Sequence, residues 1–223
     1  MRVLYAGVVF QNAHQRGIQR VFREIIGRLP GDIEATFALS RRAHSELPAR
    51  AKVVRTKTPL AGVLPRRVQR ALDPLVIPAR FRQASVGCDL FHSTYYTSPP
   101  REMPSVVHVF DMIVERHVEF FAGRWVEKEV QRKRLAIEAA THLIAISDAT
   151  ARELEYFYPR VRGRVTTVHL CADHLPVRPE PLSPAPPAPY ALYVGDRHFY
   201  KNFGAVLEAL ESPRWPNGVG LCV

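Results

Sequence analysis

The chain has 223 residues, of which 47% are hydrophobic and 23% are charged, as is ordinary for a soluble globular protein. This length allows one large domain or one and a half smaller ones. Lysine and arginine total 31 against 21 aspartates and glutamates, which gives a formal net charge of +10. Such a balance favours polyanionic partners, namely nucleic acid, anionic membrane or phosphorylated metabolites, without choosing among them.

Several classes of protein lack support in the sequence. Cys88, Cys171 and Cys222 lie far apart and form no C-x-x-C pair, so neither a disulfide framework nor a zinc site is indicated, and a reducing cytoplasm fits best. The apolar stretch 3–10 is too short to span a membrane and lacks a signal-peptide cleavage pattern. The patterns G-x-G-x-x-G, D-x-D, H-E-x-x-H and G-x-S-x-G are absent, which argues against nicotinamide chemistry, metal-dependent sugar transfer, zinc proteolysis and serine hydrolysis.

The N-terminal segment predicts a β-α-β unit. Residues 2–9 form a strand of the buried type, and apolar side chains between Ile18 and Leu29 then recur at helical spacing. Gly31 follows as a stop signal, and residues 33–39 form a second strand. A β-α-β unit implies a parallel sheet with covering helices.

The alternation of helices and strands continues along the chain. Pro74 and Pro78 split or kink the second helix, and Ser147 or Asp148 caps the last helix of this set. The expected strands are 89–92, 106–110, 142–146 and 165–170, and the expected helices are 64–84, 125–140 and a third that runs to residue 156.

A proline-rich stretch divides the chain. Half of residues 176–189 are proline, so this segment is expected to be an extended, semi-rigid linker. Residues 1–175 then form a Rossmann-like domain with a doubly wound parallel sheet. Residues 190–223 supply a strand, a helix over 201–210 and a second strand. Together these elements are expected to be the first β-α-β unit of another Rossmann-like domain, which is incomplete here.

The turn after the linker has the features of a diphosphate site. Residues 190–194 are a short apolar strand, and Gly195 permits a tight turn. Arg197 and Lys201 place two cations at the mouth of the helix that Asn202 begins. A strand, a glycine turn, two cations and a helix N-terminus together predict binding of a diphosphate.

The loop after the first strand predicts a further contact with a ligand. In doubly wound sheets ligands bind beyond the carboxyl ends of the strands. Gly17 lets the backbone approach a ligand there, and Arg20 lies within reach of an anion. A loop with solvated arginines explains the same residues equally well.

Three polar residues lie at the ends of other strands. His92 is a candidate for binding a sugar hydroxyl or phosphate, although a strand-end histidine is more often only hydrogen-bonded. Asp111 either touches the substrate or caps the next segment, since a carboxylate at an apolar strand end needs a use or a partner. Ser147 either contacts the substrate or serves as a plain N-cap.

Basic residues gather in two helical clusters. Such runs are usually solvated faces, but they also suit docking on anionic lipid. Interleaved aromatics and a recognisable module for nucleic acid are missing, so nucleic acid is not an expected partner. The cluster residues are Arg66, Arg67, Arg70, Arg80, Arg82, Lys128, Arg132, Lys133 and Arg134.

The order of these motifs resembles the retaining glycosyltransferases of family four, which have the GT-B architecture of two Rossmann-like domains. Each motif is weak alone, but the set keeps the family's order over nearly the whole chain. The matching pieces are 16–20, 91–93, 110–113, 137–147 and 193–195, with Arg197, Lys201 and Asn202.

The resemblance implies roles for the candidate residues. The N-terminal domain would hold the acceptor and the C-terminal domain a nucleotide-activated sugar. Arg197 and Lys201 match the pair that grips the donor diphosphate and stabilises the leaving group, so no metal or other cofactor is expected. Gly17 matches the loop under the donor phosphate. The residues that line the acceptor side of the cleft are Arg20, His92, Asp111 and Ser147.

The function expected from the resemblance is sugar transfer, of the hexosyltransferase type, from a nucleotide sugar to a glycan or lipid-linked acceptor, with retention, in polysaccharide biosynthesis. No catalytic residue is identified.

The location expected is the cytoplasm, with peripheral contact at the inner face of an anionic membrane as an option. The family's acidic motif belongs beyond residue 223, so we expect a truncated transferase that is inactive by itself. The alternatives are a non-catalytic basic module that docks on membrane or RNA, and a nucleotide-sugar epimerase.

Overall fold

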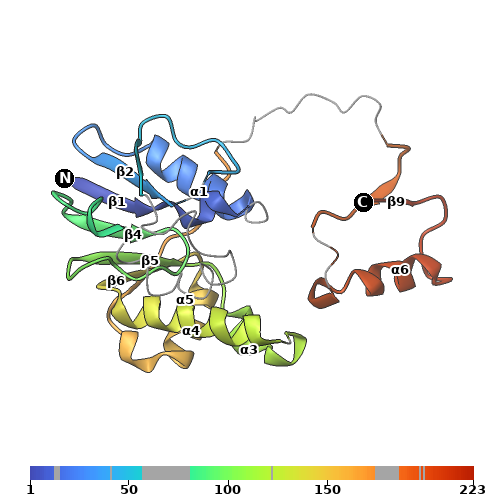
Figure 1. Ribbon diagram of the computed structural model, residues 1–223. Coiled ribbons are helices and arrows are strands. Elements are labelled where there is room, and N and C mark those ends of the chain that lie inside the picture. Colours follow the sequence, from blue (N-terminus) through green and yellow to red (C-terminus); the bar gives the residue numbers. More distant parts are fainter. Residues whose placement is uncertain are drawn as a thin grey trace, which may run out of the picture. The chain divides into compact units, whose positions relative to one another are not determined.

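The computed structural model describes residues 1–12, 16–40, 42–56, 81–121, 123–173, 186–195, 197 and 199–223 (Figure 1). The chain divides into two compact units. The first comprises Met1–Val118 and Ala122–Cys171, and the second comprises Glu119–Phe121 and Ala172–Val223.

The first unit is built on a seven-stranded sheet in the order β3-β2-β1-β4-β5-β6-β7, in which every neighbouring pair is parallel. The order reverses between β1 and β4, which makes this the topological switch point of the sheet. The strands are β1 (Arg2–Ala6), β2 (Glu34–Leu39), β3 (Lys52–Arg55), β4 (Leu90–Ser93), β5 (Ser105–Val109), β6 (His142–Ala145) and β7 (Val165–Thr167).

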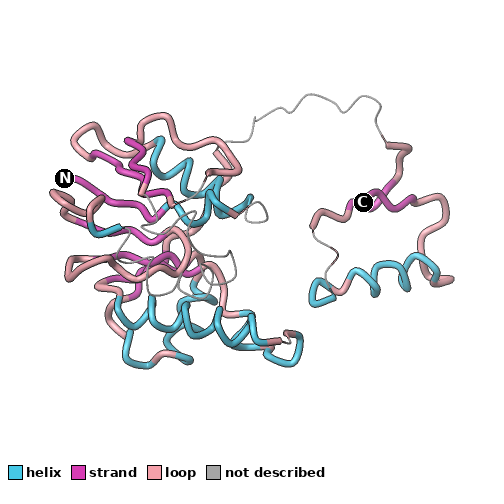
Figure 2. Tube along the Cα trace, in the orientation of Figure 1, coloured by secondary structure: helices cyan, strands magenta, loops and turns pink. Residues whose placement is uncertain are grey.

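Helices cover both faces of this sheet, because side chains alternate along each strand. On one face α1 (Arg16–Gly27) packs Phe22 and Ile26 against Tyr5 and Phe37. On the other face α4 (Arg124–Ala139) and α5 (Asp148–Phe157) pack against β5 and β6 (Figure 2). The predicted fold class, a Rossmann-like doubly wound parallel sheet, is confirmed.

Short helical turns complete the first unit at the loops. They are η1 (Gly7–Gln11), α3 (Ile113–Arg116), η2 (Val118–Phe120), which runs into the second unit, and η3 (Pro159–Val161).

Strand β1 is shorter than the sequence predicts. It ends at Ala6, and residues 7–11 form the 3-10 turn η1 in place of further strand. A Cβ built on Gly7 would lie 2.4 Å from Cδ2 of Leu39, so the chain passes β2 too closely for a side chain. A strand predicted over 165–170 likewise ends at Thr167, and β3 was not predicted at all.

Helix positions agree better with the sequence. The helix predicted over 125–140 is α4, and Ser147 caps α5 by accepting a hydrogen bond at Oγ from the N–H of Thr150, at 3.1 Å. The helix predicted over 64–84, with Pro74 and Pro78, lies outside the described residues up to residue 80, and so do four members of the first basic cluster: Arg66, Arg67, Arg70 and Arg80.

The described part of the second unit contains a β-α-β arrangement, as predicted. Strands β8 (Tyr190–Leu192) and β9 (Gly220–Cys222) pair in parallel. Between them lie η4 (Phe199–Lys201) and α6 (Phe203–Glu211), so the helix begins two residues later than predicted. The domain boundaries 1–175, 176–189 and 190–223 stay predictions, since residues 174–185 lie outside the described part of the chain.

Candidate ligand edge and anion-binding turn

The carboxyl edge of the seven-stranded sheet gathers the candidate residues of the first unit. All seven strands are parallel, so their carboxyl ends lie at one edge. Gly17 and Arg20 begin α1 after β1, Asp111 follows β5, and Ser147 follows β6. His92 lies in β4, one residue before the strand ends.

Two buried polar side chains fix the chain at the switch point. Thr94 donates from Oγ1 to the carbonyl of Ala6 and accepts from the N–H of Val9 at 3.3 Å. Gln19 donates from Nε2 to the carbonyls of Val9, at 3.0 Å, and Asn12, at 2.5 Å. The turn η1 is therefore tied to β4 and α1. Neither Gln19 nor Thr94 was predicted to have a role, and their burial shows it only once the fold is known.

Gly17 and Arg20 are exposed on the first turns of α1. Apart from its chain neighbours and the backbone of α1, no heavy atom of the described residues lies within 4 Å of a Cβ built on Gly17, so the space that they leave beside its backbone is open. The lack of a side chain is thus not required by the packing of α1, and the role predicted for Gly17 toward a ligand stays a prediction.

His92 lies in the core and not at the solvent-facing edge of the sheet. Its Nε2 is 2.8 Å from Nδ1 of His108, and the two rings stack with centroids 5.0 Å apart. Phe22 of α1 meets both rings edge-on at 5.3 Å, and Tyr5 lies 5.1 Å from the His92 ring. This arrangement corresponds to the alternative in which the strand-end histidine is only hydrogen-bonded.

Burial keeps this histidine pair neutral. It lowers the pKa of His92 well below 6.5, with a further contribution from His108, and lowers the pKa of His108 to about 4. Neither ring carries a charge near pH 7, so His92 contributes packing and a hydrogen bond beneath the edge.

Asp111 is exposed where β5 ends. Its Oδ1 accepts from the N–H of Ile113 at 3.2 Å, which opens α3 with an Asx turn. The capping role that the sequence left open is therefore observed. The backbone carbonyl of Asp111 accepts from Nζ of Lys133 at 2.6 Å.

Beneath Asp111 lies a buried ion pair that the sequence does not predict. Nζ of Lys133 lies 2.9 Å from Oε2 of Glu115, and the two side chains are only 5% and 6% exposed. The same ammonium lies 5.2 Å from the ring centroid of Tyr96, whose φ of 43° is unusual for a residue other than glycine. Lys133 was assigned to a basic surface cluster, and its burial corrects that interpretation.

The neighbouring cations of α4 are also paired. Arg132 contacts Glu129 at 2.5 Å, and Arg134 contacts Glu138 at 2.9 Å. Three members of the second basic cluster therefore have carboxylate partners, so this part of α4 is not an open cationic patch.

In the second unit, Arg197 and Lys201 lie on the turn between β8 and α6, and both are exposed. The guanidinium of Arg197 stacks 5.1 Å from the ring of Phe203, and Nζ of Lys201 lies 5.1 Å from the ring of Tyr200. No carboxylate among the described residues is seen paired with either cation. Aromatic rings thus hold two cations at this turn.

The backbone of this turn suits an anion. Gly195 has a φ of +152°, a conformation that favours glycine. Asn202 is the N-cap residue of α6, but it adopts the left-handed conformation and its side chain does not cap the helix. The Asn202 side chain therefore leaves the N–H groups of Phe203 and Gly204 uncapped beside two cations, while the N–H of Ala205 donates to the Asn202 carbonyl at 3.2 Å. Asp196 and His198 lie outside the described residues.

Other kinds of site are not apparent in the described residues. Among them no group of three or more His, Cys, Asp or Glu side chains is placed to hold a metal ion. None of the helices in the described ranges has the length and apolar character to cross a membrane.

The first unit thus provides a doubly wound sheet with polar side chains at its carboxyl edge, and the second provides an exposed cationic turn at the start of a helix. No protein-family model matches the chain, and no curated protein matches it. Among solved structures, the chain is similar to Arabidopsis thaliana UGT89C1 complexed with UDP-L-rhamnose, with a TM-score of 0.48 and 14% sequence identity, covering 100% of this chain and 68% of that chain. A likeness of this strength does not assign a family.

Proposed function

We propose that the chain serves glycosyl transfer, in which a sugar passes from a nucleotide sugar to a hydroxyl of a glycan or lipid-linked acceptor with retention at the anomeric carbon. The observation that carries the proposal is the turn with Arg197 and Lys201 at the N-terminus of α6. The resemblance of the ordered motifs to retaining glycosyltransferases of family four supplies the reaction type.

The turn matches what a nucleoside diphosphate needs. A diphosphate spreads its negative charge over several oxygens, and guanidinium and ammonium groups donate charge-assisted hydrogen bonds to them. The uncapped N–H groups of α6 add further donors. In the reaction the bond from the anomeric carbon to the phosphate oxygen breaks, the electron pair leaves with the diphosphate, and Arg197 and Lys201 stabilise that charge.

The first unit is assigned the acceptor. The acceptor oxygen forms the new bond to the anomeric carbon, and its proton passes to the departing phosphate oxygen. Arg20, Asp111 and Ser147 supply polar groups at the carboxyl edge, where open α/β sheets bind ligands. His92 lies beneath this edge and contributes packing and its hydrogen bond with His108. Gly17 is assigned to a donor phosphate. Because the diphosphate charge is met by cations and N–H groups, the proposal requires no metal.

The test is calorimetric titration of the intact chain with UDP, GDP and ADP. We expect one of them to bind, and we expect the change of Arg197 and Lys201 to Ala to weaken that binding by at least about 100-fold, because each of the two side chains contributes a charge-assisted hydrogen bond of about 1.5–3 kcal/mol. Arg214→Ala is the matched control, since it removes an exposed cation of the same unit. Absence of binding, or binding that the double variant leaves unchanged, would contradict the proposal.

The main alternative is a basic module that docks on polyanions. The net charge of +10 favours it. The carboxylate partners of Arg132, Lys133 and Arg134 argue against it, because paired cations attract lipid phosphates or RNA less strongly. Steeply salt-dependent binding of anionic vesicles or RNA, with no nucleoside-diphosphate binding, would favour the module.

A further inference from the structure

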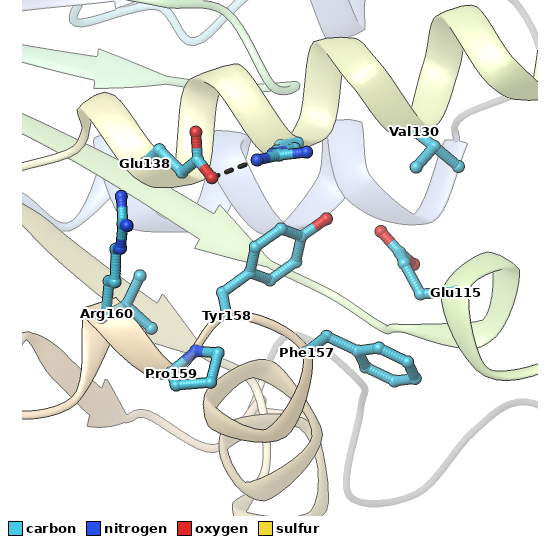
Figure 3. Close-up of a pocket in the computed structure, with 9 residues that line it drawn as sticks. Glu115, Val130, Glu138, Phe157, Tyr158, Pro159 and Arg160 are labelled. Atoms are coloured by element: carbon cyan, nitrogen blue, oxygen red, sulfur yellow. Dashed lines mark hydrogen bonds and ion pairs between the residues drawn. The ribbon is translucent and has the colours of Figure 1, made fainter.

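A pocket in the helical layer of the first unit meets its own polar groups. It lies between α4, the end of α5 and η3 (Figure 3). Burial, with Glu115 adding to the effect, raises the pKa of Tyr158 to about 12, so its hydroxyl keeps a proton and points toward the Glu115 carboxylate. Oε2 of that carboxylate accepts from Lys133 at 2.9 Å, and Arg134 pairs with Glu138. These groups therefore satisfy one another without a ligand.

The carboxyl ends of β1, β2 and β3 differ from this pocket, because two polar atoms there lack a partner. Nε2 of Gln11 and Oγ of Ser45 are both buried, and neither has a hydrogen-bond partner. The amide nitrogen can only donate, and the hydroxyl can donate as well. A buried donor without an acceptor destabilises the fold, so this edge stands to gain from an acceptor.

Hydrogen bonds hold these two residues at the same edge. Gln11 ends η1, which follows β1, and its Oε1 accepts from Oγ of Ser40, the residue after β2, at 3.1 Å. The N–H of His44 donates to the carbonyl of Phe10 at 2.8 Å. Ser40 and His44 are thus both held against η1, and Ser45 follows His44 directly.

Two exposed cations lie at the same edge. Arg55 is the last residue of β3 and is the register partner of Leu39, the last residue of β2. Arg42 follows Leu39 by three residues. No carboxylate among the described residues is seen paired with either arginine. Glu46 is the one acidic residue in the sequence 40–56, so positive charge predominates here.

The chemistry of these four side chains fits a phosphate group. Phosphate oxygens accept several hydrogen bonds at once, and guanidinium groups pair with them in bidentate geometry. A neutral hydroxyl can accept from Gln11 or Ser45 but makes no use of the two charges. A cationic ligand is repelled by Arg42 and Arg55.

We propose that the edge beyond β1, β2 and β3 binds the phosphate group of a phosphorylated acceptor. Arg42 and Arg55 pair with its charge. Gln11 and Ser45 are only partly buried as whole residues, so small side-chain rotations turn their donors toward the phosphate oxygens. That the phosphorylated ligand is the acceptor rests on the proposed transfer function, whereas the binding of phosphate does not.

The test is calorimetric titration of the intact chain with glucose 6-phosphate, with glucose as its neutral counterpart. A second arm uses sedimentation with vesicles of phosphatidylglycerol and phosphatidylcholine, with pure phosphatidylcholine as the counterpart. We expect saturable binding in at least one arm and none to its neutral counterpart. Arg42→Gln and Arg55→Gln should each weaken this binding at least about 10-fold, since each removes a charge-assisted hydrogen bond. Lys52→Gln is the matched control, because it removes an exposed cation from the other end of β3.

Ser45→Ala separates a contact with the ligand from a structural role. The substitution removes a hydroxyl that has no partner in the fold, so the free energy of unfolding should not decrease. Phosphate binding should nevertheless weaken about 3- to 10-fold, because one neutral hydrogen bond to the ligand is lost. Unchanged binding in this variant would count against the assigned contact.

Binding of glucose 6-phosphate assigns the phosphate to a soluble acceptor, and binding of the phosphatidylglycerol vesicles alone assigns it to a lipid headgroup. Three results would overturn the inference: no saturable binding in either arm, binding that Arg42→Gln and Arg55→Gln leave unchanged, or equal weakening by Lys52→Gln. Changing Arg197 and Lys201 to Ala should leave this phosphate binding intact. Nucleoside-diphosphate binding should in turn survive Arg42→Gln, so the inference and the proposed function fail separately.

Discussion

The two units of the chain differ in how much of their apolar surface they bury. The first unit encloses clusters of buried side chains on both faces of its sheet. In the second unit no residue of α6 is buried, and Leu192 and Val194 are 62% and 83% exposed. The first unit carries most of the hydrophobic stabilisation, and the second carries the cations to which we assign the donor.

The largest effect on stability is expected when an aromatic side chain in the core of the first unit is replaced. Phe22→Ala empties a fully buried position that contacts Tyr5 and both histidines, so we expect a loss of about 3–5 kcal/mol in the free energy of unfolding. The matched change in the second unit, Leu207→Ala on the partly exposed α6, should cost less than about 1 kcal/mol. Urea unfolding followed by circular dichroism measures both. Equal losses would break the comparison.

A second test uses the two cations that follow one another on α4. Lys133→Met leaves Glu115 buried without its partner, and we expect it to destabilise the first unit by about 3–5 kcal/mol. Arg134→Met breaks a pair with exposed side chains, which should cost less than about 1 kcal/mol. The same unfolding measurement applies to each variant. If the two substitutions cost the same, the pair under Asp111 is not buried as described.

The histidine pair gives the first unit a distinct pH dependence. The pKa of His108 is lowered to about 4, below its ordinary 6.5, so the unfolded chain binds the proton first as pH falls. The free energy of unfolding is therefore highest above pH 6.5. It falls by about 3 kcal/mol as the pH drops from 6.5 to about 4. The free energy of unfolding, measured at several pH values across this range, should depend less steeply on pH in a His108→Gln variant than in the unchanged chain. An unchanged slope would show that the pair is not buried and neutral.

The sequence predicted most strands of the first unit because they are continuous apolar runs, as buried parallel strands are. It missed β3, in which Lys52 and Arg55 flank two valines, because an edge strand with charged ends resembles a loop. It could not predict that β1 ends at Ala6, since the close passage of Gly7 by Leu39 arises only when β1 and β2 pair.

The sequence predicts the position of a site residue when its neighbours in the chain determine that position. It does not predict the position when the partners are distant in the chain. Strand-end rules placed Asp111 and Ser147 at the carboxyl edge, and cap chemistry gave the contact of Ser147 with Thr150. His92 lies in the core because His108, sixteen residues later, provides its partner. Lys133 is buried because Glu115 and Tyr96 surround it, and helical periodicity alone does not reveal those neighbours.

The turn before α6 is where we propose that the diphosphate of a nucleotide binds. The most direct measurement of this binding is amide NMR of the isotope-labelled chain during titration with the nucleoside diphosphate that binds. We expect the amide signals of Lys201, Phe203 and Gly204, at the start of α6, to shift with one common saturation curve. Saturation with no shift at these amides would contradict it.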